Sequence, residues 1–84
     1  MSKENGSPWD EELPAIVIPR DDRGGQIQVK RVRMKGKWYV DVRGWYVDRG
    51  TGDLRPGKGI AIPDDLADEV AEAIIETGTS GTPR

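Results

Sequence analysis

Residues 34–60, MKGKWYVDVRGWYVDRGTGDLRPGKGI, carry the pattern that decides the fold. Within this stretch, residues 37–47 alternate between apolar and polar side chains, which is the period of a β-strand. Lys35-Gly36 before the run and the glycine-containing residues 48–53 after it have the composition of turns. Residues 54–62 are predicted to form a further strand, bulged because Pro56, Gly57 and Gly59 interrupt it.

The alternation in residues 37–47 predicts two different faces. One face carries apolar side chains and is assigned to the core. The opposite face combines charge with one ring, a composition suited to a ligand. Gly44 weakens the pattern, so the sequence leaves open which of Trp45 and Tyr46 continues the charged face. The apolar set is Trp38, Val40 and Val42, and the charged set is Lys37, Tyr39, Asp41 and Arg43.

Two shorter strands are predicted upstream. The apolar residues 15–18 lie between Pro14 and Pro19, which favours a short edge strand. Residues 26–34 alternate with a change of phase, since the apolar positions are 27 and 29, then 32 and 34. We expect a bulge near Lys30 and Arg31 that brings all four onto one face, with Arg33 on the other.

A helix is predicted to begin after Pro63, because Asp64 and Asp65 suit a helix start and the apolar period changes. Gly78 is its expected stop. One apolar stripe can pack on the sheet, whereas the neighbouring stripe needs a second helix, which a chain with one helix must take from another copy. The predicted dimer interface contains Leu66, Ala67, Val70, Ala71, Ile74 and Ile75.

These elements predict an α+β domain at residues 14–77, with a disordered acidic arm at 1–13 and a flexible tail at 78–84. The sequence has no Cys and no His, so we expect no disulfide, no metal and no cofactor. It also lacks a signal-peptide core and any apolar run of membrane length. We therefore expect an intracellular protein, in the cytoplasm or nucleoid of a prokaryote or phage, or in a eukaryotic nucleus.

Charge is segregated along the chain. Residues 26–59 contain nine basic and three acidic side chains, a net +6, whereas residues 1–25 carry −3 and residues 60–84 carry −5. Basic side chains attract phosphates and aromatic faces stack on bases, so the middle third is predicted to hold unpaired nucleic acid. A solvated mixed-charge surface is the alternative. Competition between the acidic flanks and nucleic acid for the basic surface is a further hypothesis.

Catalysis is not expected. Residues 52–59 nearly match a phosphate-binding P-loop, but Gly59 stands where the magnesium-binding Ser or Thr is needed and no helix follows directly. Asp41 and Asp48 do not form a convincing acid/base pair, because the chain has no His and Arg43 lies next to Asp41 in the pattern. We therefore predict a binding protein rather than an enzyme.

Four pieces in order resemble the single-stranded-DNA-binding domain of the transcriptional positive cofactor four family: Lys35-Gly36-Lys37, Asp41-Val42-Arg43, Trp45-Tyr46 with Asp48, and RPGKGI at residues 55–60. The resemblance spans residues 26–75. It implies a curved four-stranded antiparallel sheet followed by one C-terminal helix (ββββα), dimerising through the helix. It also implies binding of single-stranded or melted DNA with little sequence preference, by a transcription cofactor or by a protein that protects exposed strands.

On the matching positions the resemblance implies phosphate contacts by Lys and Arg, and base stacking by Tyr46. Met34 stands where the family has a stacking phenylalanine, and the aromatic pair runs Trp-Tyr rather than Tyr-Trp, so Trp45 is the alternative stacking residue. Together with the strand pattern, the predicted nucleic-acid-binding residues are Arg33, Met34, Lys35, Lys37, Tyr39, Arg43, Trp45, Tyr46, Arg55 and Lys58.

Two other readings stay open. The same sheet surface suits RNA, because stacking platforms tolerate either sugar. A protein-interaction module, in which the basic sheet docks an acidic partner such as the transcription machinery, has the same composition.

Overall fold

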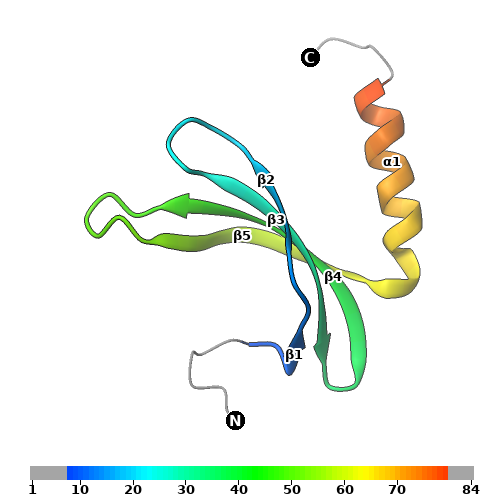
Figure 1. Ribbon diagram of the computed structural model, residues 1–84. Coiled ribbons are helices and arrows are strands. Elements are labelled where there is room, and N and C mark those ends of the chain that lie inside the picture. The colour runs from blue at the N-terminus through cyan, green and yellow to red at the C-terminus, as the bar shows by residue number, and fades with distance from the viewer. Residues whose placement is uncertain (1–7, 80–84) are drawn as a thin grey trace.

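The computed structural model describes residues 8–79 and contains one antiparallel sheet followed by one helix (Figure 1). The strand order is β1-β3-β4-β5, and β2 also pairs with β3. The predicted α+β arrangement is confirmed, with five strands because two short ones share one edge of β3. The elements are β1 (Glu11–Glu12), β2 (Ile16–Pro19), β3 (Gln26–Met34), β4 (Lys37–Val47), β5 (Leu54–Pro63), η1 (Asp64–Leu66) and α1 (Ala67–Thr79).

The β3–β4 hairpin closes through the two-residue turn Lys35-Gly36. Both turn residues have positive φ angles, 53° for Lys35 and 84° for Gly36. This is the requirement of a type I′ turn, whose twist matches that of the strands it joins. The pairing starts at Met34↔Lys37 and runs without a shift to Gln26↔Trp45.

The bulge predicted near Lys30 and Arg31 is therefore wrong. Because β3 alternates without interruption, Ile27 and Val29 lie on the face opposite to Val32 and Met34. The extra residue lies in the edge strand instead. Leu13 N donates to Arg31 O at 2.9 Å and Ile16 pairs with Val29, so residues 14 and 15 together lie opposite Lys30. Proline cannot donate to a ladder, which makes position 14 a natural place for the break.

The bulge predicted in residues 54–62 is present. Arg43 pairs with Gly59 and Trp45 with Pro56, so the single residue Gly44 lies opposite Gly57 and Lys58. The adjacent strands approach closely here. A Cβ at Gly59 would lie 2.6 Å from the Val42 carbonyl oxygen, a separation that requires glycine at this position.

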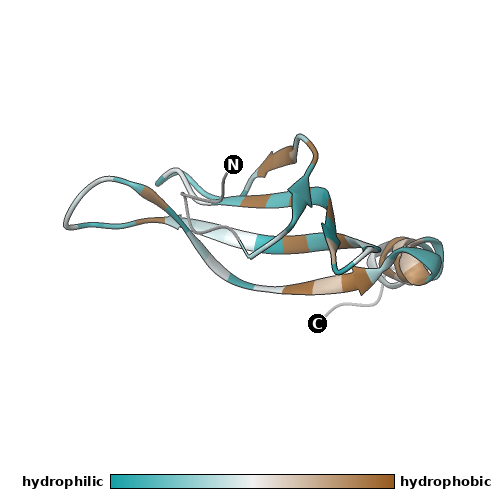
Figure 2. Cartoon of the chain, turned by 90° about the horizontal axis from the view of Figure 1, so that it is seen from below, coloured by the Kyte–Doolittle hydropathy of each residue, from teal (hydrophilic) through white to brown (hydrophobic). Residues whose placement is uncertain are grey.

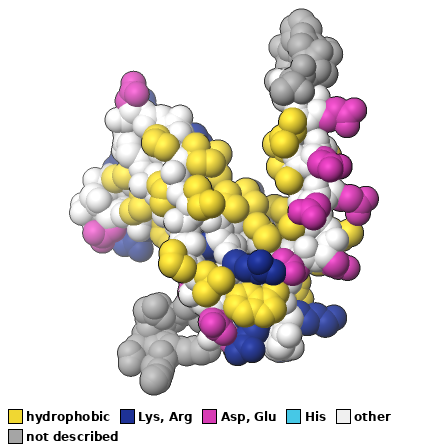
Figure 3. Space-filling model, turned by 45° about the vertical axis from the view of Figure 1, so that its right-hand side comes forward, with side chains coloured by type: hydrophobic (Ala, Val, Ile, Leu, Met, Phe, Trp, Pro, Cys, Tyr) yellow, Lys and Arg dark blue, Asp and Glu magenta, His cyan; other side chains and the backbone are white. Residues whose placement is uncertain are grey.

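The chain buries little apolar surface on its own. Among the described residues the buried hydrophobic side chains are Val32 and Ile62, and the buried polar side chain is Asp41. Apolar residues from neighbouring strands, such as Val29, Val42 and Ile60, share one face of the sheet through their pairing. Figure 3 shows hydrophobic side chains spread over the sheet and along the side of α1 that faces it, with acidic side chains on the outer side of the helix.

Helix α1 projects away from the sheet, and Figure 2 shows it end-on beside the sheet's rim (Figures 1 and 2). Leu66 is 43% exposed, Ile74 62% and Ile75 63%. The sequence pattern had allowed the stripe containing Leu66 and Ile74 to pack on the chain's own sheet. Because these side chains are exposed, the stripe is not buried there. Both apolar stripes of the helix remain available to a partner.

Two predicted boundaries need correction. Within the arm predicted to be disordered, Glu11–Glu12 form β1, which pairs with Arg33 and Val32 of β3. Sequence patterns do not reveal a two-residue polar strand whose partners lie 20 and 22 positions away. The helix continues past Gly78 to Thr79, so Gly78 is not its stop. Residues 1–7 and 80–84 of the predicted arm and tail lie outside the described part of the chain.

Replacing Gly36 by Ala should lower the free energy of unfolding by about 1–2 kcal/mol, because a side chain is disfavoured at its positive φ angle. A Cβ at Gly36 meets no atom within 4 Å, so the cost comes from the backbone alone. Urea unfolding measures it. Gly78→Ala is the control, since Gly78 lies in α1 and its added methyl group also meets nothing within 4 Å. Equal midpoints for wild type and Gly36→Ala would contradict the assigned turn.

Candidate nucleic-acid interface

Three of the predicted lysines are exposed and free of ion pairs within residues 8–79: Lys35, Lys37 and Lys58. Lys35 and Lys37 flank the tip of the β3–β4 hairpin, where Met34 is the direct cross-strand neighbour of Lys37. Lys58 lies in the β5 bulge. An unpaired ammonium group can meet a phosphate without first giving up a carboxylate, so these three positions are the most available cations of the predicted set.

Arg43 has a different environment. Its Nε and Nη2 donate to the two carboxylate oxygens of Asp41 at 3.1 and 2.8 Å, and its Nη1 donates to Gly57 O at 3.0 Å. The Asp41 hydrogen bonds raise the pKa of Arg43 above its ordinary value, against the effect of desolvation. Asp41 is 1% exposed, so Arg43 links a buried carboxylate through a bidentate pair to the Gly57 carbonyl of the bulge. About a quarter of the Arg43 side chain, 26%, stays exposed.

Arg33 and Arg55 form ion pairs at the surface. Arg33 Nη2 lies 3.3 Å from Glu11 Oε1, and Arg55 Nε lies 2.9 Å from Asp48 Oδ2. The backbone N–H groups of residues 50 and 51 lower the pKa of Asp48, and Arg55 adds to this effect. Exposed pairs of this type contribute at most about 1 kcal/mol, so the arginines can exchange their carboxylates for phosphates.

The aromatic residues do not share one surface. The unbroken β3–β4 register places Trp45 on the same face as Arg43, Tyr39 and Lys37, which answers the question left open by Gly44. Lys30 Nζ lies 6.0 Å from the centre of the Trp45 ring. Tyr46 points to the other face, next to its cross-strand neighbour Arg55, and is 46% exposed. The predicted residues therefore wrap both sides of β4.

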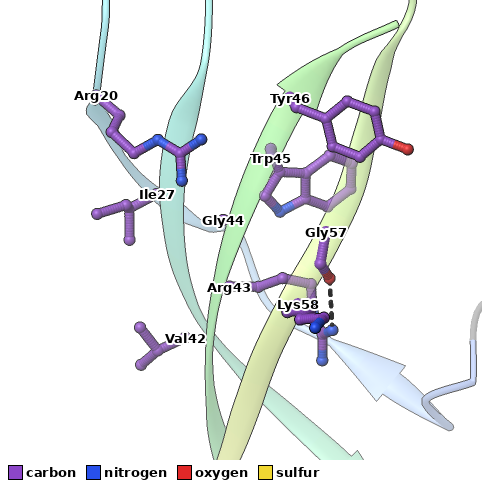
Figure 4. A pocket seen from close by; sticks show the side chains of 9 residues that line it. All are labelled: Arg20, Ile27, Val42, Arg43, Gly44, Trp45, Tyr46, Gly57 and Lys58. Atoms are coloured by element: carbon purple, nitrogen blue, oxygen red, sulfur yellow. Dashed lines mark hydrogen bonds between the residues drawn. The ribbon is translucent and has the colours of Figure 1, made fainter.

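Sequence reasoning missed Arg20, which the fold brings to β4. A hollow of ≈ 380 Å³ beside the bulge takes residues from three strands, β3, β4 and β5, and from the loop after β2 (Figure 4). Its lining combines glycine backbone, rings, apolar groups and cations. Only the strand register, which places Arg20 beside Gly44, could have revealed it. The hollow is lined by Arg20, Ile27, Val42, Arg43, Gly44, Trp45, Tyr46, Gly57 and Lys58.

Arg31 and Trp38 form a second group that the sequence did not single out. The guanidinium carbons of Arg31 and Arg33 lie 5.7 and 5.8 Å from the centre of the Trp38 ring. Arg31 Nη2 also lies 2.7 Å from Asp64 Oδ1. Trp38 lies on the predicted apolar face of β4. The cation–π contacts explain how its ring is accommodated beside the arginines of β3.

The acidic N-terminal segment reaches the basic strand β3. Glu11 pairs with Arg33, Glu12 with Lys30, and Asp10 Oδ2 accepts a hydrogen bond of 2.8 Å from the backbone N–H of Lys35. Backbone bonds reinforce these contacts, because Asp10 N donates to Arg33 O at 2.8 Å. We call residues 10–13 the acidic strap, since they lie along the edge of β3.

Between positions 8 and 79, no three His, Cys, Asp or Glu side chains gather in a way that could hold a metal ion. No helix in that range is long and apolar enough to cross a membrane. Lys58 of the P-loop-like stretch lies within β5 rather than at a helix start, so this stretch lacks the context of a phosphate-binding loop.

A curved open sheet with one C-terminal helix and exposed cations beside rings defines a small α+β protein suited to binding polyanions. A sequence model of the family described as Transcriptional Coactivator p15 (PC4) matches residues 22–73, and the chain belongs to this family. It is a non-catalytic family of the single-stranded-DNA-binding, coactivator type. The predicted family resemblance is thereby confirmed.

A solved structure supports the assignment. The chain resembles the crystal structure of BPSL1147, a PC4 homolog from Burkholderia pseudomallei K96243, with a TM-score of 0.70 and 28% sequence identity. The match covers 89% of this chain and 100% of the homologue. No curated protein sequence matches the chain significantly.

Proposed function

We propose that this protein is a non-catalytic homodimer that binds single-stranded DNA with little sequence preference and acts as a transcription cofactor. The observation that carries the proposal is the set of exposed lysines, Lys35, Lys37 and Lys58, which have no ion pair among the described residues. Two of them, Lys37 and Lys58, line hollows that also contain aromatic residues. Phosphates would meet the lysines while unpaired bases stack on Tyr46 or Trp45. Membership of a single-stranded-DNA-binding family supports the same assignment.

The dimer is part of the proposal because the isolated chain leaves large apolar groups uncovered. Ile16 is 67% exposed, Ile60 61% and Ile74 62%. Burying such groups against a second copy supplies the stability that the thin core of one chain lacks. Sedimentation equilibrium should therefore give twice the monomer mass of 9.3 kDa, and the monomer mass alone would contradict the dimer.

The acidic strap would compete with DNA in this mechanism. Its carboxylates occupy Arg33 and Lys30 in the way that phosphates would. Residues 1–25 carry a net negative charge and residues 26–59 a net positive charge, so the contact between the strap and β3 should weaken as salt rises. A DNA strand would then displace the strap only when it makes more contacts with the basic strand than the strap does.

A labelled single strand of about twenty nucleotides, titrated by fluorescence anisotropy, tests the main proposal. Affinity should fall as salt rises, with a log–log slope of about −2, since each phosphate contact on a single strand contributes about −0.7 and three lysines are unpaired. The matching duplex should compete poorly. Salt-independent binding would contradict the electrostatic mechanism. No binding at low salt would contradict the proposed function and favour the alternative, in which the basic sheet docks an acidic protein partner. A matched RNA strand compares the two sugars.

Ring variants complete this titration. Tyr46→Ala or Trp45→Ala should lower affinity by about 1–3 kcal/mol at whichever position stacks on a base. Tyr46→Phe keeps the ring and is the matched control for Tyr46. Unchanged affinity in both alanine variants would reduce the mechanism to backbone contacts.

The double variant Glu11→Gln/Glu12→Gln should bind single-stranded DNA about two- to five-fold more tightly at low salt, because each exposed ion pair it removes is worth up to about 1 kcal/mol. Glutamine keeps the size of the side chain, so the pairing of β1 with β3 is retained. The control is Glu72→Gln/Glu76→Gln on α1, which changes the net charge equally. Equal affinities of the two double variants would rule out competition by the strap.

A further inference from the structure

Arg20 occupies an unusual position beside the β5 bulge. Its Nη1 lies 3.0 Å from the point where a Cβ on Gly44 would be, so the guanidinium rests on the backbone of β4 in space that a side chain at position 44 would fill. The side chain is 49% exposed. Its nearest carboxylate contact, Nε to Asp21 Oδ2, is 4.0 Å long and too distant for a hydrogen bond.

The loop after β2 holds the backbone of Arg20 in place. Arg20 N donates to Gly25 O at 2.9 Å, which continues the β2–β3 ladder by one pair. Asp21 Oδ1 accepts hydrogen bonds from the backbone N–H groups of Arg23 and Gly25, both at 2.9 Å. These bonds also lower the pKa of Asp21. The Asp21 carboxylate is thus hydrogen-bonded to the loop backbone, and its contact with Arg20 is a long ion pair without a hydrogen bond.

The hollow under Arg20 has the chemistry of a base-binding site. Ile27 and Val42 line it together with Tyr46, which shares their face of the sheet, and Arg20 and Lys58 add cations (Figure 4). Most of the lining surface is apolar. A phosphate would leave the rings and aliphatic groups without a partner, whereas a planar base can contact rings, glycine backbone and a guanidinium together.

We infer that this hollow receives one unpaired nucleobase of the bound strand and that Arg20 is a base-contacting residue, stacking on the base or donating to its edge. The inference rests on the proposed single-strand function. It adds to that function one contacting residue, Arg20, and the part of the DNA that it contacts, a nucleobase. A base held in a duplex is paired and stacked inward, so it cannot enter the hollow without being flipped out. Arg20 would therefore favour single strands over duplex.

The test compares Arg20→Ala with Arg23→Ala, an exposed arginine three positions away in the same loop that does not line the hollow. Two labelled strands of equal length are titrated by anisotropy: an oligothymidylate, and a strand in which abasic residues keep every phosphate but carry no base. Arg20→Ala should weaken binding of the oligothymidylate by roughly five-fold or more relative to Arg23→Ala, as loss of a base contact does. On the abasic strand the two variants should bind alike.

A second variant acts on the same contact from the other side. The added methyl group of Gly44→Ala meets the flexible end of Arg20, so it displaces the guanidinium rather than backbone. It should weaken oligothymidylate binding in the wild-type background and have little further effect in the Arg20→Ala background. Unchanged urea midpoints show that the variants fold.

The alternative outcomes are distinguishable. If Arg20→Ala and Arg23→Ala match on both strands, Arg20 contributes only general charge and the inference is overturned. If Arg20→Ala weakens both strands equally, Arg20 contacts a phosphate and the base-binding site is overturned. In either case the wild-type protein still binds single strands and the proposed function stands. A wild-type protein that binds neither strand would overturn the proposed function and the inference together.

Discussion

The register of the β3–β4 hairpin is the constraint on which the rest of this structure depends. In a sheet, moving one strand by one residue transfers every side chain to the opposite face. The turn at Lys35-Gly36 fixes that register from one end, and the pairing then continues unbroken to Trp45. As a result Trp45 joins the charged face, while Gly44 and Tyr46 belong to the other.

The β5 bulge is the second constraint, and the paired charges of Arg43 and Asp41 hold it. Arg43 donates both to the buried carboxylate of Asp41 and to the carbonyl of Gly57 within the bulge. A charged network of this kind is costly to bury unless every group is bonded, and here the described geometry satisfies the carboxylate. The irregular part of β5 is thus held by specific hydrogen bonds, and the hollow lies next to it.

Much of the fold could be predicted from local pattern. Alternation over residues 37–47, the turn residues before it and the change of period after Pro63 are signals that need no tertiary information. The bulge in β5 was also predictable, because Pro56, Gly57 and Gly59 disfavour a regular ladder. The phase change in β3 was misread, since both faces of that strand carry apolar groups and the irregularity lies in its edge partner.

The candidate site was less predictable, because it depends on contacts between distant residues. Composition identified the basic and aromatic residues, and the spacing placed Arg43 next to Asp41, but neither could tell that Arg43 also bonds Gly57 in the bulge or that Lys58 has no ion pair among the described residues. Arg20 has no local signal and becomes meaningful only beside Gly44. Similarly, β1 is two residues long and exists through its pairing and charge contacts with β3.

The position of β5 in the sheet has a consequence for solubility. Within the described chain it pairs with β4 alone, so one side of it is an open edge that could recruit further strands and start aggregation. Pro56 lacks an N–H group, the bulge disrupts regular hydrogen-bonding geometry, and Lys58 adds charge. The features that shape the hollow thus also discourage indefinite strand addition. A substitution that regularised β5 would remove both properties at once.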